Sequence, residues 1–368
     1  MEILLGLSWQ LGHGRTEPIA IELFPLLRGI KDRGSLQVAA RENGISYRHA
    51  WGLMQKWKTL LGQPLAHLER GRGATLSPMG EKLLWGQNRI SARLGPELDS
   101  LASELASELH GLIRRDQQLP PLRIFASHGL AVPILRDLLQ ARTEISVDLQ
   151  FRGSLDALRL FAAGKCDLAG FHLPEGALGE RLAPRFARHL NADADQLIKV
   201  VRRHQGIVTV VGNPKDIRSI ADLARPGTRF INRQPGSGTR LMLDLLLEDA
   251  GIEPSLVQGY NTEEFTHLAV AAMVASGAAD AGIAIEPVAH QFGLNFEPIT
   301  TEDYWLAARR KDMSGIAQGE LMTLLRSQDF RAAVSGLPGY DATPAGEISM
   351  VGQVFTQPRP GRPPQRHA

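Results

Sequence analysis

Short β-rich runs alternate with helical stretches across the last two thirds of the chain, and this alternation constrains the fold most. Runs separated by helix-length segments are typical of βαβ units, in which helices cover a mostly parallel sheet. The pattern predicts a doubly wound α/β fold over residues 119–335, with two lobes joined by crossing strands. The predicted strands are Leu122–Ala126, Val147–Phe151, Asp167–Phe171, Gly206–Val211 and Phe230–Asn232.

Polar residues directly follow several of these strands. Because strand carboxyl ends meet at one edge of an α/β sheet, we expect them to line a cleft for a small ligand. A lone histidine is more often a structural hydrogen-bonding group, so that alternative stays open for both histidines. Tyr260, Thr262 and Glu263 are expected at the cleft floor or at a hinge. The cleft residues are Ser127, His128, Gly153, Ser154, His172, Asn232 and Arg233.

The sharpest single motif is Pro235-Gly236-Ser237-Gly238-Thr239-Arg240, which opens a predicted helix. Glycines allow close backbone approach, the hydroxyls can donate, and a helix N-terminus attracts an anion. The motif therefore predicts an oxyanion or carboxylate contact through Ser237, Gly238, Thr239 and Arg240. It has neither the Walker A spacing nor the dinucleotide fingerprint. The alternative is a plain turn and helix cap.

The first 79 residues follow the pattern of a winged helix-turn-helix. Ser35 and Ser46 can cap two successive helices, with Gly44 at the turn between them. In the second helix Ala50, Leu53, Met54, Trp57 and Leu61 recur at helical spacing as a core face. Two short extended arms around a basic glycine-rich tip, residues 68–76, predict the wing. Residues Ile19 to Leu76 include nine basic residues and only four acidic ones. This excess of positive charge lies in the part of the chain that is expected to bind DNA. The predicted DNA contacts are Ser35, Ser46, Tyr47, Arg48, His49, Gln55, Lys58, Arg70 and Arg72.

Residues 80–118 are predicted to form a linker helix, and an interruption at Gly95-Pro96 is left open. Leucines recur at intervals of three and four residues, which is typical of a seam packed against another helix. We expect the seam to join two subunits, as a homodimer or a dimer of dimers. Packing within the same chain is the alternative. The seam residues are Leu94, Leu98, Leu101, Leu105, Leu109 and Leu112.

Composition excludes several classes of protein. A net charge of +2 argues against a uniformly basic nucleic-acid coat, and the single cysteine, Cys166, excludes a disulfide scaffold and indicates a reducing cytoplasm. The sequence predicts no membrane partner, no cofactor and no metal site, since no export signal, long apolar segment or close cluster of metal ligands is found. A C-terminal extension, residues 336–368, is expected to be partly disordered, especially its proline- and arginine-rich end from Gln357.

The N-terminal quarter resembles the DNA-binding domain of molybdate-responsive ModE-type regulators, relatives of the LysR type. The resemblance is carried by residues 34–40, the helix Ser46-Tyr47-Arg48-His49-Ala50-Trp51, and residues 71–73 and 76–84. It implies ModE-like DNA binding. The rest of the chain departs from ModE, because it shows neither paired small β-barrel segments nor a molybdate-loop signature.

The C-terminal part resembles the periplasmic-binding-protein-like domain found after helix-turn-helix modules and in some molybdopterin-biosynthesis-related proteins. Residues 151–158, 167–174, 230–240 and 277–283 carry this resemblance. It implies a type II two-lobed fold that senses molybdate, tungstate or a small carboxylate such as formate.

Together these features predict a cytoplasmic, ligand-responsive transcriptional regulator that is not an enzyme. We expect double-stranded DNA and a small anionic effector as partners, and molybdenum-enzyme or related metabolic genes as targets. The alternative is a small-anion-binding protein or an enzyme with a repurposed winged helix. A transport binding protein would share the sensor fold but has no use for a recognition helix.

Overall fold

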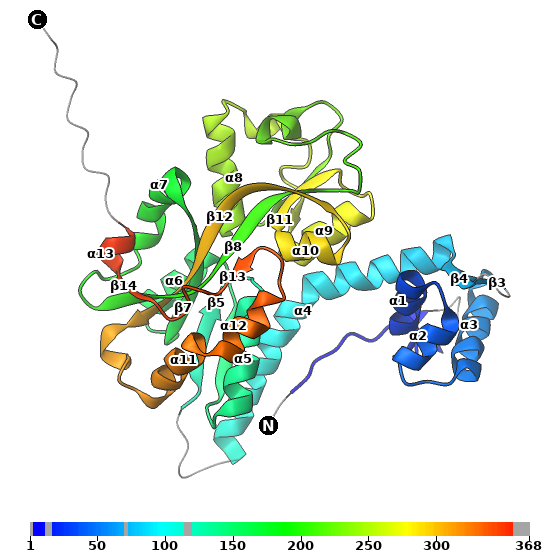
Figure 1. Cartoon of the computed structure of the whole chain (residues 1–368), viewed down its shortest axis with the longest axis horizontal. Helices are drawn as coiled ribbons and strands as arrows, with labels where there is room; N and C mark the ends of the chain where they lie inside the picture. Colours follow the sequence, from blue (N-terminus) through cyan, green and yellow to red (C-terminus); the bar gives the residue numbers. More distant parts are fainter. Residues whose placement is uncertain (1–2, 12–16, 70–72, 114–119, 356–368) are drawn as a thin grey trace, which may run out of the picture. The chain divides into compact units, whose positions relative to one another are not determined.

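The computed structural model describes residues 3–11, 17–69, 73–113 and 120–355 (Figure 1). The chain divides into two compact units: an N-terminal unit, Gly6–Gly95, and a C-terminal unit, Met1–Leu5 with Pro96–Ala368. The division falls at the Gly95-Pro96 step inside the predicted linker helix, so the predicted segment 80–118 contributes to both units. Each unit is described by itself below.

The N-terminal unit contains the predicted helices. Ser35 and Ser46 cap α2 and α3 as expected: Ser35 Oγ accepts from the Val38 amide at 3.3 Å, and Ser46 Oγ accepts from the His49 amide at 3.1 Å. A Cβ on Gly29 would lie 2.7 Å from Ala39 Cβ, so α1 and α2 pack too closely for a larger residue there. The elements are β1 (Gln10–Leu11), β2 (Glu17–Pro18), α1 (Leu23–Arg33), α2 (Leu36–Glu42), α3 (Tyr47–Leu61), β3 (Ala66–Glu69) and β4 (Gly73–Leu76).

The predicted wing is an antiparallel pair, β3 with β4. Ala74 donates its amide to Gly34 O at 2.7 Å, which ties the wing to the end of α1. Gly73 has a φ of +99°, and a Cβ there would lie 2.5 Å from Gly34 O. Only glycine fits this position. The wing tip, with Arg70 and Arg72, lies outside the described residues.

The linker helix α4 covers Pro78–Ile113 and starts two residues before the predicted Gly80. Ser77 explains the earlier start, because its Oγ accepts from the Gly80 amide at 3.1 Å and so caps the helix. The helix continues through Pro96 without an interruption there. Residues 114–119, which follow α4, lie outside the described residues.

The C-terminal unit is built on one curled sheet with the strand order β10-β9-β11-β8-β12-β7-β5-β6. Lobe 1 contains the parallel strands β5 (Leu122–Ala126), β6 (Val147–Phe151) and β7 (Leu168–Pro174), and lobe 2 contains β9 (Phe230–Arg233), β10 (Glu263–Glu264) and β11 (Ala281–Ile285). The predicted two-lobed α/β fold is confirmed. The helices are α5 (Ala131–Arg142), α6 (Ser154–Ala162), α7 (Gly176–Ala187), α8 (Gly238–Asp249), α9 (His267–Ala275), α10 (Glu286–Gln291), α11 (Ile316–Arg326) and α12 (Gln328–Ser335), with short 3-10 turns at Ile220–Ala224, Pro254–Leu256 and Arg310–Asp312.

Two strands of fifteen residues, β8 (Asp195–Thr209) and β12 (Asn295–Arg309), cross between the lobes side by side (Figure 1). The end of β8 pairs with β11 in lobe 2, and the end of β12 pairs with β7 in lobe 1. The predicted strand Gly206–Val211 was therefore wrong at both ends. Charged residues such as Lys199 and Arg203 obscure the start of β8 in the sequence, because their partners Asp303 and Glu302 lie on the distant β12.

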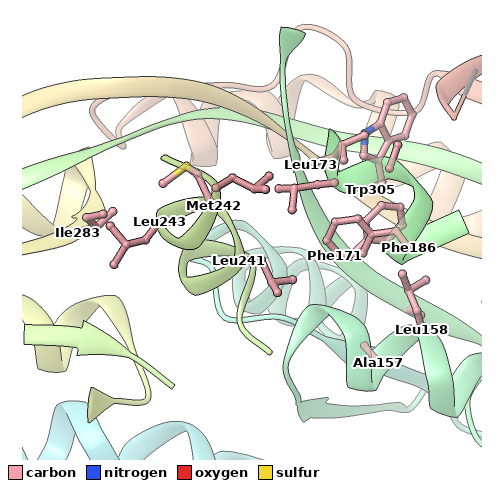
Figure 2. Packing of buried hydrophobic residues seen from close by; sticks show 14 of the residues in the cluster. Ala157, Leu158, Phe171, Leu173, Phe186, Leu241, Met242, Leu243, Ile283 and Trp305 are labelled. Carbon is pink, nitrogen blue, oxygen red and sulfur yellow. The ribbon is translucent and has the colours of Figure 1, made fainter. Parts of the chain in front are cut away.

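Hydrophobic side chains cover both faces of the sheet. In β5, Phe125 packs on one face with α6, while Ile124 and Ala126 pack on the other with α5. This alternation is what a sheet covered on both sides requires. Figure 2 shows the larger cluster, in which Phe171 of lobe 1 and Met242 of lobe 2 both take part.

The C-terminal unit extends beyond the predicted boundary at residue 335. The strands β13 (Tyr340–Asp341) and β14 (Ile348–Met350) pair with β8, and α13 (Val351–Val354) follows. Val351 and Phe355 are buried in the large cluster, so this segment is part of the hydrophobic core of the C-terminal unit. The end of the extension lies outside the described residues. Within the described part of the chain, no helix has both the length and the apolar character needed to cross a membrane.

Candidate functional sites

A small cavity lies where the two lobes and the crossing strands meet. Its volume is about 20 Å³, close to the room that one water molecule needs. All of its lining residues are polar or glycine. They are Ser127, His128, Arg152, Gly153, Ser154 and His172 from lobe 1, Arg203 and Glu302 from the crossing strands, and Arg233, Gln234, Ser237, Gly238, Thr239 and His267 from lobe 2.

The structure brings together nine of the eleven cleft residues predicted from the sequence. Their role in binding stays a prediction, but their common location agrees with the strand-end argument. Thr239 Oγ1 also accepts from Gln205 Nε2 at 2.6 Å, which orients that hydroxyl. The nine are Ser127, His128, Gly153, Ser154, His172, Arg233, Ser237, Gly238 and Thr239.

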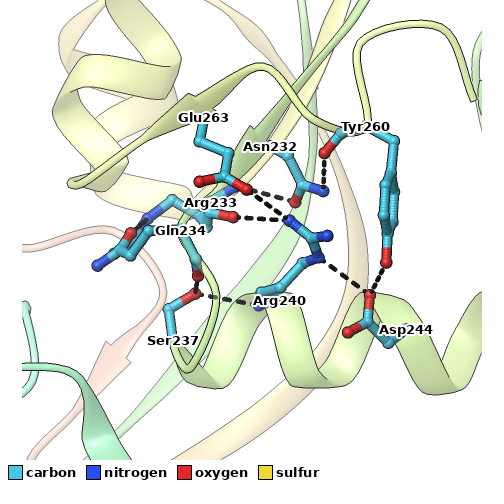
Figure 3. Close-up of polar contacts among 8 residues, drawn as sticks. All are labelled: Asn232, Arg233, Gln234, Ser237, Arg240, Asp244, Tyr260 and Glu263. Carbon is cyan, nitrogen blue, oxygen red and sulfur yellow. Dashed lines mark hydrogen bonds and ion pairs between the residues drawn. The ribbon is translucent and has the colours of Figure 1, made fainter. Parts of the chain in front are cut away.

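Asn232 and Arg240 do not line the cavity, contrary to the sequence-based expectation. Figure 3 shows the polar contacts that they make instead. Asn232 is buried and donates to Tyr260 O at 2.9 Å. The Arg240 guanidinium turns away from the cavity: it bonds Glu263 at 3.2 Å and Asp244 at 3.1 Å. It also lies 3.9 Å from the centre of the Tyr260 ring. Through these contacts with its acidic and aromatic neighbours, Arg240 holds α8 against the strands of lobe 2.

Tyr260, Thr262 and Glu263 likewise lie outside the cavity lining. Tyr260 donates to Asp244 Oδ1 at 2.7 Å, and the Thr262 carbonyl accepts from the Asn232 amide at 2.9 Å. They therefore do not form the floor of this cavity, and the alternative of a hinge stays a prediction. They belong to the network around Arg240 behind the site.

Three helices begin at the cavity. Gly153 and Ser154 start α6, Ser237 caps α8, and His267 is the first residue of α9. The first amides of a helix lack partners within it and carry partial positive charge, so each of these ends favours an anion. A Cβ on Gly153 would lie 3.3 Å from Gly236 O, which shows how closely the two lobes approach here.

Two fully buried arginines face the cavity with one carboxylate between them. Arg203 pairs with Glu302, with Nε to Oε1 at 2.6 Å. Arg233 bonds Gln234 Oε1 at 3.3 Å and Phe265 O at 2.8 Å, but in the described part of the chain no carboxylate lies within ion-pair distance of it. Burial and the nearby Arg203 charge lower the pKa of Arg233 to about 9. An uncompensated buried cation is costly, and a bound anion would relieve that cost.

The three histidines at the cavity are neutral around pH 7. Burial, followed by the Arg233 charge, lowers the pKa of His128 to about 3. Burial and the arginine charges also lower the pKa of His172 and of His267 well below the usual range. A neutral imidazole can donate one hydrogen bond to a ligand without adding charge.

Ser127 and His172 lie at a distance that a nucleophile and its base would have, with Oγ and Nδ1 2.8 Å apart. A buried imidazole with so low a pKa is a weak base. Among the residues that the structure describes, no carboxylate orients the His172 ring, which instead contacts Tyr304 edge to face. The geometry therefore favours binding over nucleophilic catalysis.

Five lining residues were not predicted from the sequence. Arg203 and Glu302 lie on stretches of β8 and β12 that were not recognised as strands. His267 follows Thr266, whose Oγ1 accepts from the Ala269 amide at 2.9 Å. That cap could have marked another helix N-terminus. The five are Arg152, Arg203, Gln234, His267 and Glu302.

Of the nine predicted DNA-contacting residues, Arg70 and Arg72 lie outside the described residues, and five of the other seven are exposed on the N-terminal unit. Ser46, Tyr47, Arg48, His49 and Lys58 are exposed on or beside α3, while Ala50, Leu53, Met54 and Trp57 face the core as expected. Gln55 and Ser35 are less exposed. Trp51, absent from the predicted contacts, is 47% exposed beside Tyr47 at 50%. Large aromatic rings left on a recognition helix are suited to contact with bases.

Comparison with known proteins identifies the C-terminal unit. Residues 136–326 match the model of the PBP superfamily domain. The chain is 33% identical over 228 residues to the uncharacterized protein YvgK of Bacillus subtilis, covering 62% of this chain and 73% of YvgK. It is 37% identical over 102 residues to the molybdenum-pterin-binding protein MopB of Rhodobacter capsulatus, covering 26% of this chain and 38% of MopB.

Two solved structures are similar over most of their length. Full-length HypT from Salmonella typhimurium, a hypochlorite-specific LysR-type transcriptional regulator, superimposes with a TM-score of 0.44 at 15% identity, covering 86% of this chain and 99% of HypT. A mutant of Corynebacterium glutamicum OxyR with bound hydrogen peroxide gives 0.41 at 17% identity, covering 87% and 96%. The resemblance of the C-terminal part to a binding-protein-like domain is confirmed by the family model. The chain belongs to the PBP superfamily.

Proposed function

We propose that the chain is a ligand-responsive transcriptional regulator that binds double-stranded DNA through α3 and the wing and senses a small anion in the C-terminal cavity. The observation that carries the proposal is the buried, uncompensated Arg233 guanidinium in a polar cavity at three helix N-termini. The same chain carries a winged helix-turn-helix. A sensor and a DNA reader in one chain are the two parts that such a regulator needs.

One relative points to a molybdenum-containing effector, since MopB is named for molybdenum-pterin binding. The polar side chains around the cavity suit molybdate, tungstate or a small carboxylate such as formate, and the lobes must separate to admit such an anion to a cavity of about 20 Å³. Control of molybdenum-enzyme or related metabolic genes, and a location in the cytoplasm with the DNA, follow from the same proposal. The proposal assigns DNA binding to residues 1–79. It assigns ligand sensing to residues 119–335 together with the C-terminal segment that follows them.

The linker helix supports a dimer. On its C-terminal-unit side, α4 turns its serines inward: Ser100 Oγ accepts from the Phe151 amide and Ser103 Oγ from the Leu149 amide, both at 2.9 Å. Leu101 and Leu105 are left 49% and 41% exposed. Exposed leucines at a spacing of four are suited to a second helix, so we propose a homodimer or a dimer of dimers through this face.

An enzyme is the second candidate, favoured only by the short Ser127–His172 contact. The low imidazole pKa and the lack of an orienting carboxylate in the described residues weigh against it. We therefore propose that the cavity binds without turnover.

Selection of bound fragments from sheared genomic DNA, followed by footprinting, tests the proposal. Protein stripped of ligand should protect a discrete site, and one small anion should change the affinity for that site by about 5- to 150-fold. Sequence-independent binding with no response to any anion would contradict the proposal.

A further inference from the structure

We infer that the cavity selects a divalent oxyanion over a monovalent anion. The inference rests on the proposed function, because it names the class of ligand that the sensor takes. It follows from the charges, the unused hydrogen-bond donors and the surface chemistry of the lining residues.

The charges that face the cavity do not balance. Arg203 and Glu302 neutralise each other in their buried pair. Arg233 retains its charge inside the cavity. Arg152, half-buried at the edge, donates to the neutral acceptors Gln150 Oε1 at 2.9 Å and Phe151 O at 3.2 Å. No ion pair to Arg152 occurs across residues 3–11, 17–69, 73–113 and 120–355. Two positive charges thus remain for a ligand to compensate.

Three buried polar atoms on lining residues have no hydrogen-bond partner within the described residues: Ser154 Oγ, Arg233 Nη1 and His267 Nδ1. Each of these side chains is more than nine-tenths buried. They come from different elements, α6, β9 and α9. A buried polar atom without a partner costs free energy, so the presence of all three on residues that line one cavity indicates that a ligand with several oxygens completes the site.

The lining residues of the cavity favour a polar ligand. The lining contains polar side chains and glycines alone, and the helix N-termini of α6, α8 and α9 approach from different elements. An anion with oxygens on every side can use all of these donors. A formate ion would leave one positive charge uncompensated and would turn its C–H toward a polar wall.

Calorimetric titration of the full-length, ligand-stripped protein tests the inference. Sulfate and molybdate serve as divalent probes, and formate and nitrate as monovalent ones, at fixed pH and ionic strength. We expect the better dianion to bind about 100-fold more tightly than either monoanion, because its second charge is also attracted by the two fixed cations. A monoanion that binds as tightly as the better dianion would overturn the inference.

Two separate charge variants give a second test, the ratio of dianion to monoanion affinity. The test still works if one of the two variants fails to fold. Arg233→Gln and Arg152→Gln should each narrow the dianion-to-monoanion affinity ratio by about tenfold. The control Arg159→Gln, exposed on α6 and paired with Asp156, should leave the ratio unchanged. Equal weakening of both anion classes in the two variants would overturn the inference.

The outcomes also separate this inference from the proposed function. If a monoanion binds as tightly as the dianions and alters DNA affinity, the regulator stands and the divalent selectivity falls. If no anion binds at all, both fall.

Discussion

Arg203 and Glu302 face each other across the antiparallel crossing strands, and Arg203 Nε donates to Glu302 Oε1 at 2.6 Å. Both side chains are 2% exposed, and both line the cavity. Irregular register flanks the pair, at Pro298/Thr300 and at Tyr304/Trp305. The cavity therefore contacts the two strands that connect the lobes.

Breaking this pair should destabilise the fold. Glu302→Ala leaves a buried guanidinium without its partner, and we expect the free energy of unfolding to fall by about 3–5 kcal/mol. Urea denaturation of the ligand-free protein measures the change. The control Asp156→Ala, which removes an exposed pair with Arg159, should cost under about 1 kcal/mol. A similar small loss in both variants would contradict the assigned role of the buried pair.

Arg48 should contribute to specific DNA binding. It is exposed near the start of α3, where recognition helices contact base edges. We expect Arg48→Ala to weaken specific binding by about 1–3 kcal/mol while ligand affinity stays the same. Fluorescence anisotropy on the selected site measures both the loss and the effect of the control Arg159→Ala. An unchanged affinity would remove Arg48 from the predicted contacts.

Thr239 should contribute a hydroxyl to the anion. We expect Thr239→Val to weaken anion binding by about 1–3 kcal/mol, because a buried donor near charge is lost. Thr239→Ser keeps the hydroxyl and the partner of Gln205, so it should retain most of the affinity. Calorimetry on both variants measures the difference. Equal affinity in the valine variant would make the glycine-rich turn structural.

Stability of the ligand-free protein should fall as the pH falls below about 6.5. The pKa of His128 is lowered from 6.5 to about 3 in the folded state. Between these values the unfolded chain binds a proton that the folded chain does not, so the free energy of unfolding decreases by up to about 1.4 kcal/mol per pH unit for this histidine. Urea denaturation at pH 7.5 and 5.5 should show a smaller decrease for His128→Gln than for the unsubstituted protein. Equal decreases would contradict the burial of a neutral His128.

The leucine face of α4 should hold two copies of the chain together. Leu101→Lys with Leu105→Lys places two charges in the proposed seam, and we expect dissociation toward monomers in sedimentation equilibrium. Helicity should be preserved, because both positions are exposed. Glu104→Lys places a cation at an already charged, exposed position of the same helix and serves as the control. An unchanged mass in the double variant would show that the face does not form the interface.

The sequence predicted those strands and helix caps that depend on residues close together in the chain. The strands Leu122–Ala126 and Val147–Phe151 and the caps Ser35 and Ser46 were confirmed, because each depends on a few adjacent residues. The crossing strands were predicted only in part, as Gly206–Val211, since the charged residues of their other stretches are matched by partners about one hundred positions away. The same reason hides Arg203 and Glu302 from sequence-based site prediction.

Arg240 is the opposite case, a residue that was predicted to contact the ligand but does not line the cavity. Its place after Gly-Ser-Gly-Thr suggested a ligand contact, and Thr239 beside it does line the cavity. The direction of a long side chain depends on the packing around it, and here Asp244, Tyr260 and Glu263 draw the guanidinium to the opposite side. None of these contacts can be read from the motif itself.

The most direct test of the account is the DNA affinity of the full-length, ligand-stripped protein measured against anion concentration, in the unsubstituted protein and in Arg233→Gln. The account predicts that a small anion shifts the affinity for the selected site in the unsubstituted protein, and that the midpoint moves to higher anion concentration in the variant. Specific DNA binding that is the same at every anion concentration, in both proteins, would contradict the link between the cavity and the DNA.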